Sequence, residues 1–176
     1  MLVREAASAE TAALLQVHRL AFGQDEESLL VASLLADPSA QPVLSLVAEK
    51  QGRVVAHALF TSVKLLGPDH PPGAAILAPL AVVPPAQRSG IGRALIERAC
   101  ELLAQRQVQL LFVLGDPRYY TKVGFEPAYP HGLKAPYEIE PEAAWMVRAL
   151  GPAVLGSLHA TVQCANALAP DKYWRE

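Results

Sequence analysis

The chain has 176 residues, a length that suits one domain. Hydrophobic residues make up 52% of it and charged residues 18%, which is enough apolar material for a sizeable core and argues against a disordered chain. With 15 Lys and Arg against 17 Asp and Glu, the formal net charge is −2, so we expect no basic footprint for a nucleic acid.

We also expect no membrane partner. No uninterrupted apolar run is long enough to span a bilayer, and the first residues lack the apolar stretch of a signal peptide. Cys100 and Cys164 lie far apart without a CxxC pair, so we interpret them as two reduced thiols of a cytoplasmic protein. The sequence leaves open whether the chain acts as a monomer or as a homodimer.

The first third predicts one strand and two helices. Residues 2–5 read as a short strand, and Ser8 is expected to cap a helix that runs to about residue 21 with a broad buried face. A second helix is expected over residues 26–36. Asp37 and Pro38 end it, because the residue before a proline avoids helical geometry.

Three strands are expected next, over residues 43–49, 53–63 and 74–83, the first two joined by a hairpin turn at Gln51-Gly52. Pro79 interrupts the third strand, and proline cannot donate a hydrogen bond to a sheet ladder. We therefore predict either a bulge or a locally unpaired edge at Pro79.

The second half predicts one strand–helix–strand unit. Residues 90–106 show the clearest amphipathic helix pattern, and residues 108–114 are apolar enough for a strand buried on both faces. A short helix could begin after Asp116-Pro117, and residues 143–150 favour a strand. Residues 151–176 receive no assignment. This order predicts a mixed α/β fold.

The turn Gln87-Arg88-Ser89-Gly90-Ile91-Gly92 lies between a predicted strand and a predicted helix. The start of a helix has free backbone N–H groups and the positive end of the helix dipole, so it attracts anions. Gly90 and Gly92 let a phosphate approach the backbone closely, and Arg88 and Arg93 add positive charge. The pattern predicts an anion site.

This turn matches neither of two common nucleotide-binding motifs. A Walker A loop would end in GK[ST], which the segment lacks, and a dinucleotide fingerprint would need glycine at position 95, where the chain has Leu95. The plainest alternative to an anion site is a turn whose glycines only permit tight packing.

Residues Gln87 to Gly92 match the Q/R-x-x-G-x-G/A signature, so the chain resembles the GCN5-related N-acetyltransferase (GNAT) superfamily. The later segment LGDPRYYTKVGF, residues 114–125, is similar to a YhbS-like subgroup of predicted acetyltransferases. The resemblance covers residues 1 to about 150, within a single GNAT domain of residues 1–176 that ends in a C-terminal extension, residues 151–176.

The resemblance implies a central, mostly antiparallel sheet that is splayed at the cofactor site and flanked by helices. It implies acetyl-CoA as cosubstrate, with backbone N–H groups of the turn on the pyrophosphate and an open strand edge along the pantetheine arm. We expect no metal, since no His, Cys, Asp or Glu cluster has ligand spacing. The cofactor-binding residues implied are Leu80, Ala81, Val82, Gln87, Arg88, Ser89, Gly90, Ile91, Gly92 and Arg93.

The activity implied is transfer of the acetyl group to a primary amine, of a small molecule or a peptide, by direct transfer in a ternary complex. The alternative of a different class is a non-catalytic acyl-CoA sensor or interaction module. A third alternative is an unrelated nucleotide-binding protein that uses the same turn.

Tyr120 matches the tyrosine that serves the family as general acid. Its phenol, with a reference pKa of about 10, stays protonated at neutral pH and could protonate the leaving thiolate, whose reference pKa is about 8.5. The alternative is that Tyr120 only packs against the cofactor. A backbone N–H of Ala81 or Val82, with Val82 preferred, would hold the oxyanion.

The general base is left open. His57 has a suitable intrinsic pKa, although a lone histidine in an apolar strand is more often structural. Glu49, Glu26 and Asp25 are carboxylate alternatives, and a water chain to solvent is another.

The acceptor site is expected to lie among the helices of residues 8–36 and the loop of residues 66–73. The acidic run of residues 24–27 could attract a cationic amine or simply favour a helix start. Tyr137, Trp145 and Trp174 could border the acceptor or form a subunit contact.

Overall fold

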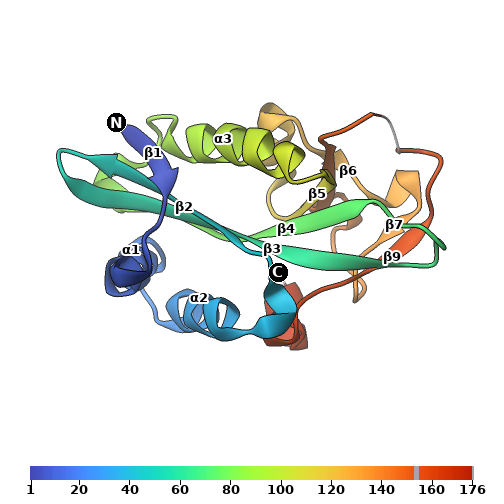
Figure 1. The fold of residues 1–176 in the computed structure, drawn as a ribbon, viewed down its shortest axis with the longest axis horizontal. Helices are drawn as coiled ribbons and strands as arrows, with labels where there is room; N and C mark the ends of the chain where they lie inside the picture. The colour runs from blue at the N-terminus through green and yellow to red at the C-terminus, as the bar shows by residue number, and fades with distance from the viewer. Residues whose placement is uncertain (153–154, 176) are drawn as a thin grey trace.

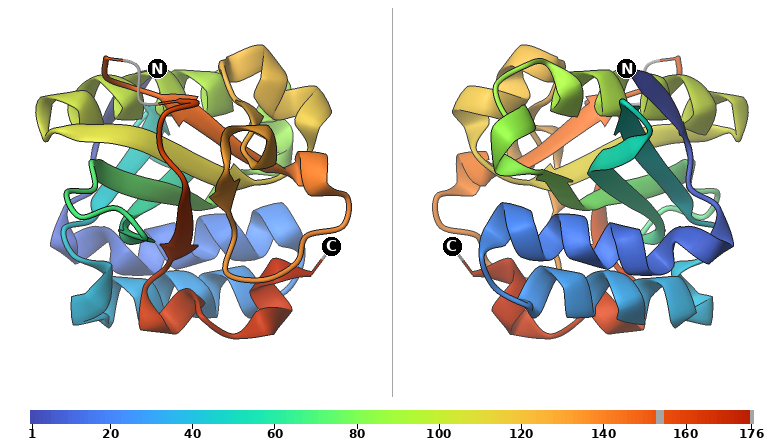
Figure 2. Two further views of the ribbon diagram at one scale, coloured as in Figure 1. Left: turned by 90° about the vertical axis from the view of Figure 1, so that its right-hand side faces the viewer. Right: turned by 90° about the vertical axis from the view of Figure 1, so that its left-hand side faces the viewer.

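The computed structural model describes residues 1–152 and 155–175. A twisted mixed sheet lies between α3 on one face and α1 and α2 on the other. Residues 164–175, called the C-terminal segment below, lie beside α2 (Figure 1; Figure 2). In chain order the strands and helices are β1 (Leu2–Glu5), α1 (Thr11–Phe22), α2 (Glu26–Ala36), β2 (Leu44–Lys50), β3 (Arg53–Leu66), β4 (Gly73–Val82), α3 (Ile91–Gln105), β5 (Val108–Leu114), α4 (Pro117–Tyr120), β6 (Glu126–Pro127), β7 (Leu133–Lys134), β8 (Trp145–Ala149) and β9 (Ala160–Gln163).

The nine strands of the described residues pair in the order β1-β2-β3-β4-β5-β8-β6, with β9 on the end of β3 and β7 on β9. Neighbours are antiparallel except for the parallel pairs β4–β5 and β7–β9. The expected mixed α/β fold with a mostly antiparallel sheet is confirmed. No helix in the described part of the chain is both long and apolar enough to cross a bilayer.

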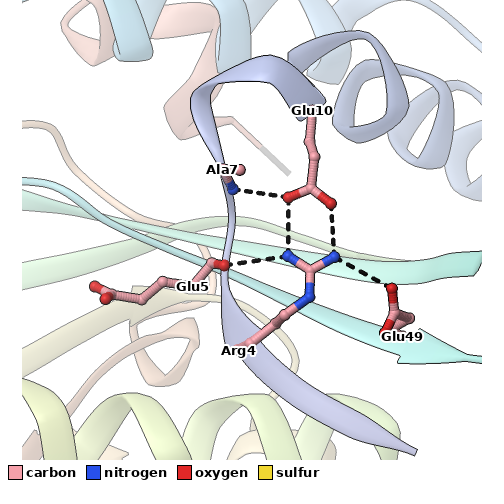
Figure 3. A network of polar contacts seen from close by, with 5 residues as sticks. All are labelled: Arg4, Glu5, Ala7, Glu10 and Glu49. Atoms are coloured by element: carbon pink, nitrogen blue, oxygen red, sulfur yellow. Dashed lines mark hydrogen bonds and ion pairs between the residues drawn. The ribbon is translucent and has the colours of Figure 1, made fainter. Parts of the chain in front are cut away.

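A network of polar contacts ties β1 to the start of the helical layer (Figure 3). The Arg4 guanidinium donates to both carboxylate oxygens of Glu10, at 2.6 and 2.9 Å, and to Glu49 Oε1 at 3.3 Å. Glu10 also accepts the Ala7 N–H at 2.7 Å. These contacts, the Arg4 hydrogen bond first, lower the pKa of Glu10 to about 2, so the carboxylate stays charged while it fixes the entry into α1.

The two faces of the sheet bury separate apolar clusters. Leu95, Ile96 and Ala99 of α3 are fully buried against one face, as the amphipathic pattern predicted. On the other face, Trp145 stacks on Phe112 at a ring distance of 5.1 Å among residues of α2 and the C-terminal segment. Helices therefore cover both faces of the sheet.

Strand β4 leaves β5 before either strand ends. The last parallel pair is Leu77 with Val113, yet β4 continues along β3 through Ala81 opposite His57. The register between β3 and β4 shifts at Pro79, because two residues, Ala78 and Pro79, lie opposite Leu59 alone. The predicted bulge is confirmed, and the predicted splay of β4 from β5 begins at the same place, directly after Leu77.

Several expected boundaries were wrong. Ser8 does not cap α1: it opens a 3₁₀ turn, and α1 begins at Thr11, because Glu10 folds back onto the Ala7 N–H. Helix α3 begins at Ile91, since Gly90 has φ 84°. The strand expected from residue 143 begins at Trp145, after a 3₁₀ turn. Residues 151–176 received no assignment, and β9 forms there.

Candidate active site

The end of β4, the start of α3 and α4 enclose a cleft of about 670 Å³, here called the α3 cleft. It lies on the α3 side of the splay. Eight of the ten predicted cofactor-binding residues line it, and so does Tyr120. The lining residues are Leu80, Val82, Ala86, Gln87, Arg88, Gly90, Ile91, Gly92, Arg93, Asp116, Tyr119, Tyr120, Lys122 and Val123.

The start of α3 presents unpaired backbone donors to this cleft. Gly90 takes φ 84°, a left-handed conformation that favours glycine, and its carbonyl accepts the first helical hydrogen bond from Ala94 N–H at 3.0 Å. The N–H groups of the three residues between them therefore precede the helical ladder. Apart from its two chain neighbours, no residue has an atom within 4 Å of the position of a Cβ on Gly90, so an anion can reach these donors.

The side chain of Gln87, an exposed residue, bonds back to the end of β4. Its Nε2 donates to the Val82 carbonyl at 2.9 Å. Val83 N–H donates to Val55 on β3, and backbone groups alternate along a strand, so those of Val82 face away from β3 into the splay. The Val82 N–H is therefore directed towards the open side of β4.

Three basic side chains and one paired carboxylate give the α3 cleft its charge. Arg88, Arg93 and Lys122 line it. Asp116 also lines it, but Asp116 caps α4 and pairs with Arg118 at 2.9 Å. The balance is positive, as a phosphate site requires. Lys122 was not among the predicted binding residues, although it lies in the segment of residues 114–125 that indicated the family.

Tyr120 lies at the junction of two cavities. Its ring packs edge-on against Tyr119 and Phe125, at centroid distances of 4.9 and 5.6 Å. No hydrogen bond engages its hydroxyl within the described part of the chain. Burial, with a smaller effect of Tyr119, raises the pKa of Tyr120 well above its usual value, so the phenol stays protonated at neutral pH.

A second cavity of about 480 Å³, here called the α2 cavity, lies on the other side of the splay. It shares Leu80, Asp116 and Tyr120 with the α3 cleft. The remaining lining residues come from α1, α2, β4, β5 and the C-terminal segment, and they are Phe22, Glu26, Glu27, Leu30, Leu77, Ala78, Pro79, Val113, Leu114, Gly115, Leu168, Lys172 and Tyr173.

His57 lies in neither cavity. It is fully buried, its Nδ1 lies 2.8 Å from His18 Nε2, and its Nε2 lies 2.8 Å from Ser45 Oγ. Burial, with the nearby His18, lowers the pKa of His57 to about 3. Both ring nitrogens are engaged and the ring is hard to protonate, so this geometry favours the structural alternative over the base.

Some of the other expected residues do not line the α3 cleft. Ala81 is buried, with its backbone turned towards β3, and the Ser89 hydroxyl donates to the Ala86 carbonyl at 2.5 Å, so Ser89 stabilises the turn. Glu49 pairs with Arg4, and Asp25 pairs with Arg19. Among residues 1–152 and 155–175, no group of three His, Cys, Asp or Glu side chains could hold a metal ion.

Comparison with known proteins identifies the family. The model of the "Acetyltransferase (GNAT) family" matches residues 11–125. YjhQ of Escherichia coli K12, named an N-acetyltransferase, is 44% identical over 154 residues, which are 86% of this chain and 84% of YjhQ.

Two solved structures share the fold over almost the whole chain. The E. coli GNAT family N-acetyltransferase YhbS in complex with CoA has a TM-score of 0.85 at 27% identity, covering 96% of this chain and 92% of YhbS. A Brucella melitensis GNAT family acetyltransferase in complex with acetyl-CoA has a TM-score of 0.75 at 28% identity, covering 95% and 97%. The chain belongs to the GNAT family of acetyltransferases.

Proposed function

We propose that the protein transfers the acetyl group of acetyl-CoA to a primary amine, directly and within a ternary complex. The observation that carries the proposal is the meeting of the α3 cleft and the α2 cavity at Tyr120. Two substrates held on opposite sides of the splay could therefore bring their reacting atoms together beside one phenol.

The α3 cleft fits the coenzyme. Its pyrophosphate would bind the backbone N–H groups at the start of α3, with Arg88, Arg93 and Lys122 supplying positive charge. The pantetheine arm would lie along the open edge of β4, where Val82 offers backbone groups. YhbS and the B. melitensis enzyme, which share the fold, were solved with CoA and acetyl-CoA.

The transfer would begin with attack of the amine nitrogen on the thioester carbonyl carbon. The carbonyl π electrons move to oxygen, and the Val82 N–H is the donor we assign to that oxyanion. Collapse of the intermediate breaks the C–S bond, and the Tyr120 hydroxyl gives its proton to the leaving thiolate. The products are the amide and free coenzyme A.

We assign proton removal from the amine to water, which reaches the α2 cavity from solvent, and a structural role to His57. The hydrogen bonds of His57 to His18 and Ser45 occupy both ring nitrogens. Tyr120 would regain its proton from solvent after the thiol leaves. Because its pKa is raised, ionisation of Tyr120 should not limit the rate near neutral pH.

We also propose that the chain works as one domain in the cytoplasm. Leu168 and Trp174 of the C-terminal segment belong to the same buried cluster as Phe112 of β5. Cys100 and Cys164 are free thiols, as expected in a reducing compartment.

Initial-rate kinetics test the proposal. Purified protein is given acetyl-CoA and a panel of alkylamines, amino acids, aminoglycosides and peptides, and free thiol is measured as both substrates are varied. Direct transfer predicts intersecting double-reciprocal lines with at least one amine. Tight acetyl-CoA binding without thiol release on any amine would contradict the transferase and support the sensor.

A further inference from the structure

The α2 cavity contains opposite charges that do not pair with each other. Glu26 and Glu27 of α2 line it, and so does Lys172 of the C-terminal segment. Within the described residues Glu26 and Lys172 take part in no ion pair, and Glu27 accepts only the neutral Gln24 amide, at 2.8 and 3.0 Å. The cavity therefore offers an anionic wall and a cationic wall to one ligand.

Most of the remaining surface is apolar. Leu30, Leu77 and Val113 are buried residues at the cavity, and Leu168 and Tyr173 of the C-terminal segment lie across from α2. Such a surface favours a hydrocarbon stem over a polar one. Tyr120, beside which the thioester is expected, also lines the cavity.

The C-terminal wall is held firmly in place. Trp174 is 3% exposed, its Nε1 donates to the Leu168 carbonyl at 2.8 Å, and its ring meets that of Trp145 at 5.6 Å. Asp37, directly after α2, accepts the Ala167 N–H at 2.9 Å. The 3₁₀ turn Asp171–Trp174, which carries Lys172 and Tyr173, is thus anchored to the layer that carries α2 (Figure 2).

We infer that the α2 cavity binds a free diamino acid, whose α-ammonium group pairs with Glu26 and Glu27, whose α-carboxylate pairs with Lys172, and whose side-chain amine reaches Tyr120. The inference rests on the proposed function, because it treats this cavity as the acceptor site. It assigns the C-terminal segment a role in specificity. This segment supplies Lys172, which recognises the carboxylate, and α2 supplies the two acidic groups.

Four acceptors with similar stems separate the charges. L-Lysine carries both end groups, pentane-1,5-diamine lacks the carboxylate, 6-aminohexanoate lacks the α-ammonium, and pentylamine lacks both. We expect L-lysine to have the highest kcat/KM, with the acetyl group found by mass spectrometry on the side-chain nitrogen. Each missing group should cost roughly fivefold, the scale of an exposed ion pair.

Variants of the two walls should respond to different acceptors. Lys172→Gln should lower kcat/KM roughly fivefold for L-lysine and 6-aminohexanoate but leave the diamine unchanged. The double variant Glu26→Gln/Glu27→Gln should lower kcat/KM for L-lysine and the diamine but leave kcat/KM for 6-aminohexanoate unchanged. Lys50→Gln and Glu138→Gln, at exposed positions that line neither cavity, serve as matched controls.

Calorimetry of L-lysine binding to the protein–CoA complex decides the inference even without turnover. Binding that weakens in Lys172→Gln would support it, and absence of L-lysine binding would overturn it. Equal kcat/KM for L-lysine and pentylamine would also overturn it while the transferase stands. L-Lysine binding with no acetylation of any amine would instead contradict the proposed function alone.

Discussion

The ring of Tyr120 packs directly on the backbone of Gly115. A Cβ at residue 115 would lie 2.7 Å from ring atom Cδ2 and closer still to Cε2. Glycine at residue 115 therefore fixes the place of the phenol at the junction of the α3 cleft and the α2 cavity. This contact links the end of β5 to the group proposed to protonate coenzyme A.

Gly115→Ala should displace the Tyr120 ring. We expect kcat to fall roughly 10- to 100-fold, the effect of a misplacement near 1 Å, with much less change in coenzyme A affinity. Steady-state kinetics with calorimetry of CoA binding would measure both. Gly151→Ala is a control, since its Cβ would meet only the Gln109 side chain, 3.1 Å away. An unchanged kcat in Gly115→Ala would contradict the role of this contact.

A pair of glycine variants isolates the anion site. Gly90 and Gly52 have φ of 84° and 76°, and neither has an atom within 4 Å of a Cβ position. Alanine at either residue should cost about 1 kcal/mol of stability, because an L-residue with a Cβ disfavours this left-handed conformation. Only Gly90→Ala should weaken CoA binding, by about tenfold or more, because its Cβ would project where the pyrophosphate is expected. Equal CoA affinity in the two variants would place the pyrophosphate elsewhere.

Gln87→Glu should weaken CoA binding in two ways. It removes the donor to the Val82 carbonyl and puts a negative charge into the α3 cleft. We expect the Kd for CoA to rise about tenfold, and less at high salt, since screening weakens the repulsion. Isothermal titration of both proteins at two salt concentrations checks this. If the variant and the parent protein have the same Kd for CoA at each salt concentration, Gln87 is not part of the site.

The buried histidine pair predicts acid sensitivity. Burial lowers the pKa of His18 to about 4 and of His57 to about 3, from 6.5 in the unfolded chain. Below pH 6.5 the two histidines bind protons in the unfolded chain but stay neutral in the folded protein. The free energy of unfolding therefore decreases as the pH is lowered from 6.5 to about 4. Each histidine should contribute a slope of about 1.4 kcal/mol per pH unit.

Urea unfolding at pH 7.5, 6 and 5 measures that slope. This range lies above the window near pH 4 and below, where the unfolded chain begins to protonate carboxylates such as Glu10, whose pKa in the folded protein is lowered to about 2. His70→Gln, a change in an exposed loop residue, should keep the slope. A flat free energy of unfolding from pH 7.5 to 5 would contradict the buried, neutral pair.

Trp174→Ala should destabilise the whole protein rather than its C-terminal segment alone. The side chain is 3% exposed in the cluster that includes Phe112 and Trp145, so its removal should cost about 3 to 5 kcal/mol. Calorimetry should show one transition at lower temperature. Two separate transitions would contradict the one-domain proposal.

Local patterns predicted much of this architecture. The amphipathic period placed α3, and Pro79 predicted the bulge that opens β4 from β5. The signature residues 87–92 predicted the turn that lines the α3 cleft. A helix start and a glycine-containing turn are determined by neighbouring residues, so a local pattern can indicate them.

Contacts between distant segments were not predictable. The His18–His57 pair joins residues 39 positions apart. No local sequence pattern could therefore show that the His57 ring is occupied by a hydrogen bond and poorly placed to act as the base. Arg148 of β8 donates to the Val123 carbonyl at 2.9 Å and so supports the turn after Tyr120, again without a local signal. The place of Lys172 depends on packing of the C-terminal segment against α2, which no periodicity encodes.

Protonation of coenzyme A by Tyr120, at the junction of the two cavities, is the step on which the proposed transfer depends most. Tyr120→Phe keeps the ring and its packing and removes only the hydroxyl, so single-turnover thiol release, with CoA affinity measured in parallel, tests this step most directly. We predict a rate about 100-fold lower at unchanged CoA affinity. A rate equal to that of the parent protein would contradict the role of Tyr120 as the acid.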